Sequence, residues 1–169
     1  MFDFTHVVSL DPAFCVKHNN THEKYLIDTN HESKFIKGRQ FSSEFFTHTD
    51  IPEEGFSRKG NLYVFLVGKA YTNNQFAAER NLSAKPLDAS ALLEMYVNHG
   101  EGLIKSIKGI FVVFIADEDK NLYLGYTSRS GLLKLYYHIS QNTLILSTSV
   151  SSILNNLEQK PQLDEVAIL

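Results

Sequence analysis

The chain has 169 residues, of which 43% are hydrophobic and 21% charged, with a formal net charge of -3. These values are ordinary for one globular domain with a sizeable core, and the slightly acidic balance argues against a nucleic-acid-binding protein. The single cysteine, Cys15, excludes an internal disulfide framework, and we see neither a signal peptide nor an apolar run long enough to span a membrane. We therefore expect a cytoplasmic domain.

The first third of the chain shows one clear strand and then a long stretch without a clean pattern. FTHVVSL (residues 4–10) is typical of a strand, and the following Asp11-Pro12 ends it because proline lacks an amide donor. KYLIDT (24–29) is a weaker strand candidate. The aromatic residues between 30 and 58 have no regular period, so we predict no element there.

The middle of the chain predicts a strand followed by helices. LYVFLVG (62–68) is continuously apolar, as expected of a strand covered on both faces. Residues 74–81 have a helix-like pattern. A longer helix is predicted to begin at Asp88, whose carboxylate suits an N-cap, and to end at Gly100. Its apolar face is predicted to contain Leu92, Leu93, Tyr96 and Val97.

The remaining third predicts a short helical turn, four strands and a short helix, which are, in order, LIKSIKG (103–109), GIFVVFIAD (109–117), NLYLGYT (121–127), LLKLYYHI (132–139), TLILSTSV (143–150) and SSILNNL (151–157). The strands cluster together instead of alternating with helices. That order favours sheet packed on sheet with helices outside, an α+β fold.

Several segments, taken together, resemble the class II glutamine amidotransferase domain at the front of asparagine synthetases. The match covers residues 60–169 and rests on GNLYVFLVGKAYTNN, PLDASALLEMYVNHGEGLIKSIKGIFVVFIAD, TSRSGLLKLYY and LILSTSVSSIL. The resemblance implies the N-terminal-nucleophile hydrolase fold, a four-layer αββα sandwich of mostly antiparallel sheets. It also implies that residues 1–160 form the amidotransferase domain.

The positions that carry chemistry in this family have changed here. Phe2 stands where active members have the nucleophilic cysteine, whose free α-amino group serves as base. The asparagine that donates to the oxyanion corresponds to Val67, and the glutamate two positions later corresponds to Lys69. Gly68 is retained, and Asp88 matches the residue that holds the substrate's amino group, although a helix cap is the simpler explanation for it. We therefore expect no catalytic residue in this domain.

The resemblance carries further expectations about the whole protein. Residues 161–169 are expected to begin a linker or helix that leads to a synthetase domain, for which the present domain serves as scaffold. ATP and magnesium are expected only in that C-terminal domain, and no cofactor or metal in this one. The synthetase domain of the same chain is the expected partner, with a homodimer as a further option and without nucleic acid or membrane.

Other functions stay open at this point. Cleavage of a leader would expose Cys15 as a nucleophile and give an active glutaminase. Alternatively the old glutamine pocket, with Val67, Lys69 and Asp88, would bind another small ligand. Weaker candidates are a metal site at His18, His22 and His31 and a hydrolase built on Ser147, Ser149, Ser151 and Ser152.

Overall fold

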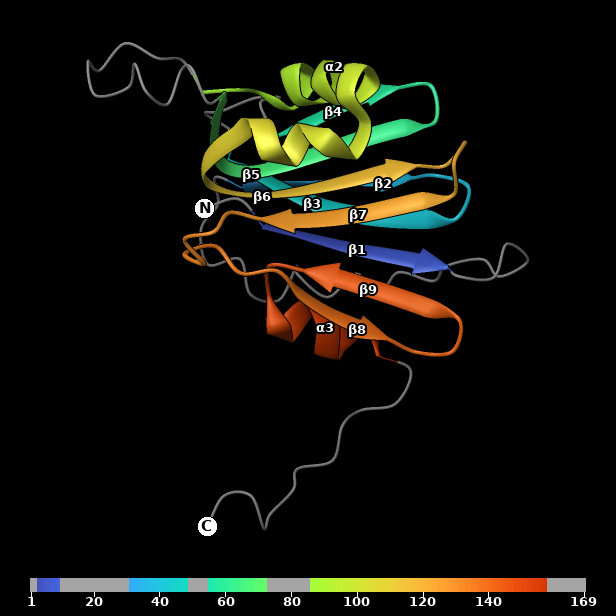
Figure 1. Ribbon diagram of the computed structural model, residues 1–169. Coiled ribbons are helices and arrows are strands. Elements are labelled where there is room, and N and C mark those ends of the chain that lie inside the picture. The colour runs from blue at the N-terminus through green and yellow to red at the C-terminus, as the bar shows by residue number, and fades with distance from the viewer. Residues whose placement is uncertain (1–2, 10–30, 49–54, 73–85, 158–169) are drawn as a thin grey trace.

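A computed structural model describes residues 3–9, 31–48, 55–72 and 86–157 (Figure 1). The described strands are β1 (Asp3–Ser9), β2 (His31–Lys37), β3 (Phe41–His48), β4 (Phe56–Lys59), β5 (Leu62–Thr72), β6 (Ile107–Asp117), β7 (Leu122–Thr127), β8 (Tyr136–Ile139) and β9 (Thr143–Ser147). The described helices are α2 (Ala89–His99), the 3-10 helix η3 (Gly100–Ser106) and α3 (Val150–Asn156). The strand expected at 24–29, the helix at 74–81 and the tail at 161–169 lie outside the described residues.

The strands form two antiparallel sheets. The five-stranded sheet has the order β2-β3-β1-β9-β8, and the four-stranded sheet has the order β4-β5-β6-β7. Every pairing recorded between these strands is antiparallel. Strands far outnumber helices in the described chain. The prediction of a mixed α and β fold with mostly antiparallel sheets is therefore confirmed.

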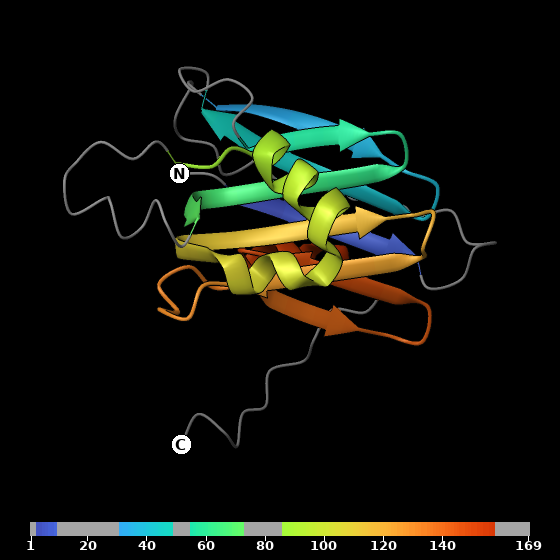
Figure 2. The ribbon, with the colours of Figure 1, turned by 45° about the horizontal axis from the view of Figure 1, so that its top comes forward.

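The core is built on β5 and β6, which pair along their whole length from Leu62 opposite Asp117 to Thr72 opposite Ile107. Both strands are apolar on both faces, so each face meets a different layer. One face packs against α2 and η3, and the opposite face packs against the five-stranded sheet. Figures 1 and 2 show this stacking, with α2 and η3 on the outside of the four-stranded sheet.

Phe41, at the start of β3, holds the two sheets together. Its ring lies edge-on to Tyr63, with centroids 4.8 Å apart, and within 6.5 Å of the rings of Phe65, Phe114 and Tyr123. Phe41 is only 1% exposed. Edge-to-face packing of this kind stabilises aromatic clusters beyond the burial of their area. We call the apolar cluster between the sheets the inter-sheet core. Its buried members are Phe41, Tyr63, Phe65, Val67, Val112, Phe114, Ala116 and Leu146, and partly buried residues such as Tyr123, Leu133 and Leu135 pack against it.

Helix α2 begins as the sequence predicts but faces the sheet slightly differently. Leu92, Leu93 and Tyr96 are buried against the four-stranded sheet, whereas Val97 is 53% exposed. The prediction that Val97 belongs to the buried face is wrong. Each residue turns about 100° around a helix axis, which places Val97 outside the stripe formed by Ala89, Leu92, Leu93 and Tyr96. Gly100 ends the helix, and its amide donates to the Tyr96 carbonyl.

Two strand predictions extend too far. Residues 132–135 are not in a strand, because the turn at Gly131 (φ +64°) directs Leu133 and Leu135 into the inter-sheet core before β8 begins. Likewise β9 ends at Ser147, and Val150 begins α3 with Ser149 as its N-cap. Helix α3 covers the outer face of the five-stranded sheet, where Ile153 packs with Ile145. Among the described helices none is long and apolar enough to cross a membrane.

Candidate functional site

Val67 lies in the middle of β5, opposite Val112 on β6. Its side chain is 4% exposed and belongs to the inter-sheet core, where its neighbours are apolar. The two methyl groups offer no hydrogen-bond donor. At this position the strand therefore contributes packing and no polar group.

Gly68 follows with a φ of +92°, a conformation that side chains disfavour. A Cβ at this residue would collide with the carbonyl oxygen of Ile110 and would lie 2.7 Å from Cδ1 of Leu133. Gly109 on β6 has the same feature, with a φ of +134° and a collision with the Lys69 carbonyl oxygen. The two strands therefore approach each other closely here, and glycine is required on both.

The structure links the chain before α2 to β5 through one backbone contact. The Leu87 amide donates to the Ala70 carbonyl at 2.7 Å, which places Asp88 next to the strand that carries Gly68 and Lys69. Lys69 is exposed and lies opposite Ile110.

Asp88 has a structural role that accounts for it locally. Its Oδ1 accepts a hydrogen bond of 2.7 Å from the Ala91 amide, as a helix N-cap does. The prediction of an N-cap is confirmed. The other candidate nucleophile positions, Phe2 and Cys15, lie outside the described residues, as do His18 and His22. Ser147 is buried, and its Oγ accepts from the Ser149 amide.

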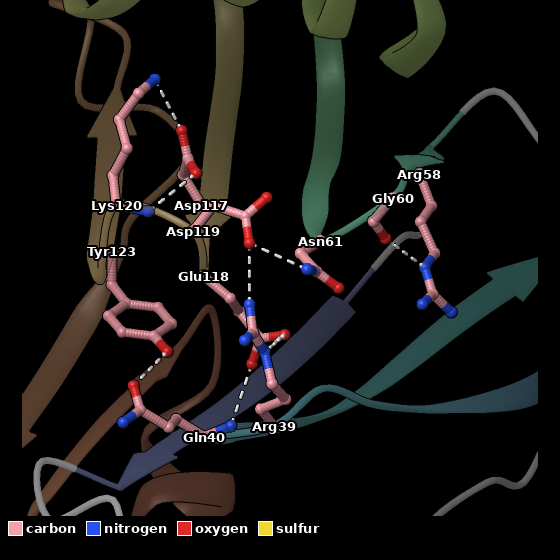
Figure 3. A network of polar contacts seen from close by, with 10 residues as sticks. All are labelled: Arg39, Gln40, Arg58, Gly60, Asn61, Asp117, Glu118, Asp119, Lys120 and Tyr123. Atoms are coloured by element: carbon pink, nitrogen blue, oxygen red, sulfur yellow. Dashed lines mark hydrogen bonds and ion pairs between the residues drawn. The ribbon is translucent and has the colours of Figure 1, made fainter.

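A second polar cluster lies at the opposite end of the same sheet, and the sequence did not reveal it. It joins the β2–β3, β4–β5 and β6–β7 turns (Figure 3). Glu118 has a side chain only 2% exposed, and its Oε1 accepts from the Gln40 amide at 2.9 Å. Arg39 pairs with Asp119 at 2.8 Å, and Asn61 donates to the same carboxylate oxygen at 2.8 Å. These contacts bridge the two sheets.

Asp117, next to this cluster, ties α2 to β6. Its Oδ2 accepts from the Tyr96 hydroxyl at 3.1 Å and from Lys120 Nζ at 2.8 Å. Burial alone would raise the pKa of Asp117, but the hydrogen bonds from Lys120 and Tyr96 outweigh it and lower the pKa below its usual value. The carboxylate is thus held charged as a structural acceptor.

Tyr123 completes the cluster from β7. Its hydroxyl donates to Gln40 Oε1 at 3.2 Å, and burial raises its pKa to about 12, with the negative charge of Glu118 acting in the same direction. The phenol is therefore neutral at physiological pH. The contacts of Arg39 and Gln40 with Glu118, Asp119 and Tyr123 connect one sheet to the other, which suits a role in joining the sheets.

Two curated relatives are similar to part of this chain. "Amidase chry2" of Gibberella zeae is 24% identical over 99 residues, which are 57% of this chain and 15% of that protein. "Amidase chyE" of Penicillium rubens is 26% identical over 89 residues, 53% of this chain and 13% of that protein. The matched region thus spans less than a sixth of either relative.

The match to a protein family is broader. The model of the glutamine amidotransferase domain matches residues 55–169, which is about two thirds of the chain. This segment contains β4 to β9 and all the described helices, together with Val67, Gly68, Lys69 and Asp88. The chain belongs to the glutamine amidotransferase domain family.

Proposed function

We propose that this domain is a glutamine amidotransferase domain that has lost its glutaminase activity and serves as the structural front half of an asparagine-synthetase-like ligase. The arrangement of two stacked sheets, with α2 and η3 outside one and α3 outside the other, supports the αββα sandwich of N-terminal-nucleophile hydrolases. Phe2 in place of cysteine supports the loss of the nucleophile.

The observation that carries the proposal is the burial of Val67 in the inter-sheet core. In active relatives an asparagine at the matching position donates its amide to the oxyanion of the intermediate. Removing one such donor typically costs roughly a hundred- to a thousandfold in rate. A valine packed among apolar neighbours cannot supply that hydrogen bond. Lys69, exposed next to it, places a cation where the family has a carboxylate.

In this account the domain acts through its folded shape. It would pack against a synthetase domain that binds ATP and magnesium, activates a carboxylate and takes its amine from a source other than glutamine. The account predicts that the longer protein continues after Leu169 into a domain with an ATP-binding motif. A full-length sequence without such a domain would contradict the ligase context while leaving the loss of glutaminase activity testable on its own.

The enzymatic part is tested by glutamate release from glutamine. Neither the wild-type chain nor Phe2→Cys should turn over, and mass spectrometry must confirm that methionine has been removed from Phe2→Cys. Phe2→Cys combined with Val67→Asn restores both the cysteine nucleophile and the oxyanion donor. Phe2→Cys combined with Val112→Asn is the control, because it places an equally buried amide on the neighbouring strand. Turnover by Phe2→Cys alone would show that Val67 does not occupy the oxyanion position.

The names of the two relatives favour one alternative, an active amidase. Because Phe2 is not a nucleophile, activity would require cleavage that exposes another one, such as Cys15. N-terminal sequencing of the protein purified from its natural source distinguishes the two accounts. The alternative requires a processed terminus that begins with Cys, Ser or Thr, whereas our proposal requires a terminus without such a nucleophile.

A further inference from the structure

The edge strands of the two sheets differ sharply in charge. Edge strand β2 contains Glu32, Lys34 and Lys37, and edge strand β4 contains Arg58 and Lys59. The other two described edges, β7 (LYLGYT) and β8 (YYHI), contain no Asp, Glu, Lys or Arg. Proteins commonly place charges on edge strands to prevent pairing with another chain. This protection is present on one flank of the molecule and missing from the other.

The two uncharged edges lie on the same flank. A Cβ at Gly125 of β7 would lie 2.8 Å from Cδ2 of Leu135, the residue that precedes β8, and Figure 2 shows β7 and β8 together on one side of the sandwich. A partner that binds this flank therefore needs no charged side chains to match charges on β7 or β8.

Exposed apolar side chains gather around β8. Tyr136 packs under α3 with Ile153, so the alternation of a strand puts Tyr137 and Ile139 on the opposite face. There they are 69% and 60% exposed. Half of the large exposed hydrophobic side chains in the described residues belong to β8 and α3, namely Tyr137, Ile139, Val150 and Leu154. An uncharged edge bordered by apolar groups on both faces favours a protein partner.

We propose that β8 pairs antiparallel with β8 of a second copy of this chain, so that two five-stranded sheets join edge to edge. The neutral strand is complementary to itself, which is what a two-fold interface requires. A two-fold axis perpendicular to the sheet keeps each face on its own side. Tyr137 and Ile139 of one copy then lie beside the same two residues of the other, and both α3 helices lie on the same outer face.

The residues of β8 also select a register. With the axis at His138, each Tyr137 lies opposite the partner's Ile139, and this aromatic to β-branched pair occurs twice. With the axis at Tyr137, the two tyrosines face each other and each Ile139 meets Leu135, which precedes the strand. The first register covers both exposed side chains with strand residues and is the one proposed.

The test is a concentration series by sedimentation velocity on the whole chain. Because β8 is short, we expect a reversible dimer that forms between about 10 and 500 µM, as small interfaces do. Tyr137→Lys combined with Ile139→Lys should raise the dissociation constant at least about tenfold by placing like charges across the axis. Val97→Lys, at another exposed apolar position, on α2, should dimerise as the wild type does.

A wild-type chain that stays monomeric over this range would overturn the proposal and leave the flank to another part of a longer protein. Association of the double lysine variant equal to that of the wild type would also overturn it. Circular dichroism and urea midpoints establish that each variant is folded.

Cross-linking gives an independent measurement. In a Cys15→Ser background, His138→Cys would place two thiols directly across the axis, where opposed Cα atoms lie about 4.5 to 5.5 Å apart, within disulfide range. We expect a covalent dimer on mild oxidation of His138→Cys and none for Val97→Cys. A chain that dimerises without forming this cross-link would contradict pairing through β8.

Discussion

Gly68 and Gly109 lie on neighbouring strands, and each leaves room for a carbonyl oxygen of the other strand. Gly68 approaches the carbonyl of Ile110, and Gly109 approaches that of Lys69. Both have positive φ values, yet the β5–β6 ladder continues past them without a break. The part of β5 that contains Val67 and Lys69 therefore depends on two glycines that are 41 positions apart in the chain.

Replacing either glycine should destabilise the fold. Gly68→Ala and Gly109→Ala should each lower the free energy of unfolding by at least about 2 kcal/mol, because the new methyl group meets both an unfavourable φ and a backbone carbonyl. Gly102→Ala is the control, since a Cβ there has nothing within 4 Å, and should change stability by less than about 0.5 kcal/mol. Urea unfolding measures all three, and equal stability of Gly68→Ala and the control would contradict the close approach.

Asp88 should act as a helix cap whatever ligand the domain binds. Asp88→Ala should lower the free energy of unfolding by about 1 kcal/mol, whereas Asp88→Asn should stay close to wild type because its amide oxygen still accepts from Ala91. Glu94→Ala, on the exposed side of α2, serves as control. A thermal-shift titration with glutamine extends the test: glutamine stabilisation that is lost in Asp88→Asn would instead indicate a retained substrate site.

Glu118 should contribute more to stability than the more visible ion pair beside it. Glu118→Ala leaves the partly buried backbone amide of Gln40 without its acceptor, which should cost about 1 kcal/mol or more. Asp119→Ala breaks a shorter ion pair with Arg39, but both of those side chains are more than 60% exposed, so the loss should stay below about 1 kcal/mol. Chemical denaturation that ranks the two variants in reverse order would refute this account of the cluster.

Asp117 should make stability depend on acid pH. Its folded pKa is lower than the usual value of 3.8, so its stabilising contribution is present above pH 4 and is lost as pH falls through the folded pKa. The difference in unfolding free energy between wild type and Asp117→Asn should therefore be largest near pH 7 and shrink below pH 4. Unfolding measured from pH 7 to pH 2.5 gives this curve. A difference that is constant with pH would show that the carboxylate charge is not what Tyr96 and Lys120 stabilise.

The elements that sequence reasoning placed well are those whose pattern is local. The apolar runs of β5 and β6 can belong only to buried strands, and Asp88 precedes an apolar helical stripe as an N-cap does. The hairpin of β2 and β3 was missed because small polar residues fill buried positions in it. Ser42 and Ser43 are 1% and 0% exposed, so apolar alternation along β3 breaks at the point where it would have identified the strand.

The candidate site shows the same division between local and distant information. The resemblance assigned Gly68 and Lys69 from one sequence motif and Asp88 from another, and the bridge between Leu87 and Ala70 shows that the residue before Asp88 pairs with β5. The contact of Glu118 with Gln40 joins turns 78 residues apart, and the acidic turn that contains Glu118 looks like an ordinary solvent-exposed turn in the sequence. Only the stacking of the sheets buries that carboxylate.

The central claim is that this amidotransferase domain does not hydrolyse glutamine, and glutamate release by the wild-type chain tests it most directly. The measurement uses saturating glutamine, a chain whose N-terminus has been verified by mass spectrometry, and a blank without protein. The account predicts no release above the blank, because Phe2 supplies no nucleophile and Val67 no oxyanion donor. Release that is proportional to protein concentration and saturates with glutamine would contradict the account.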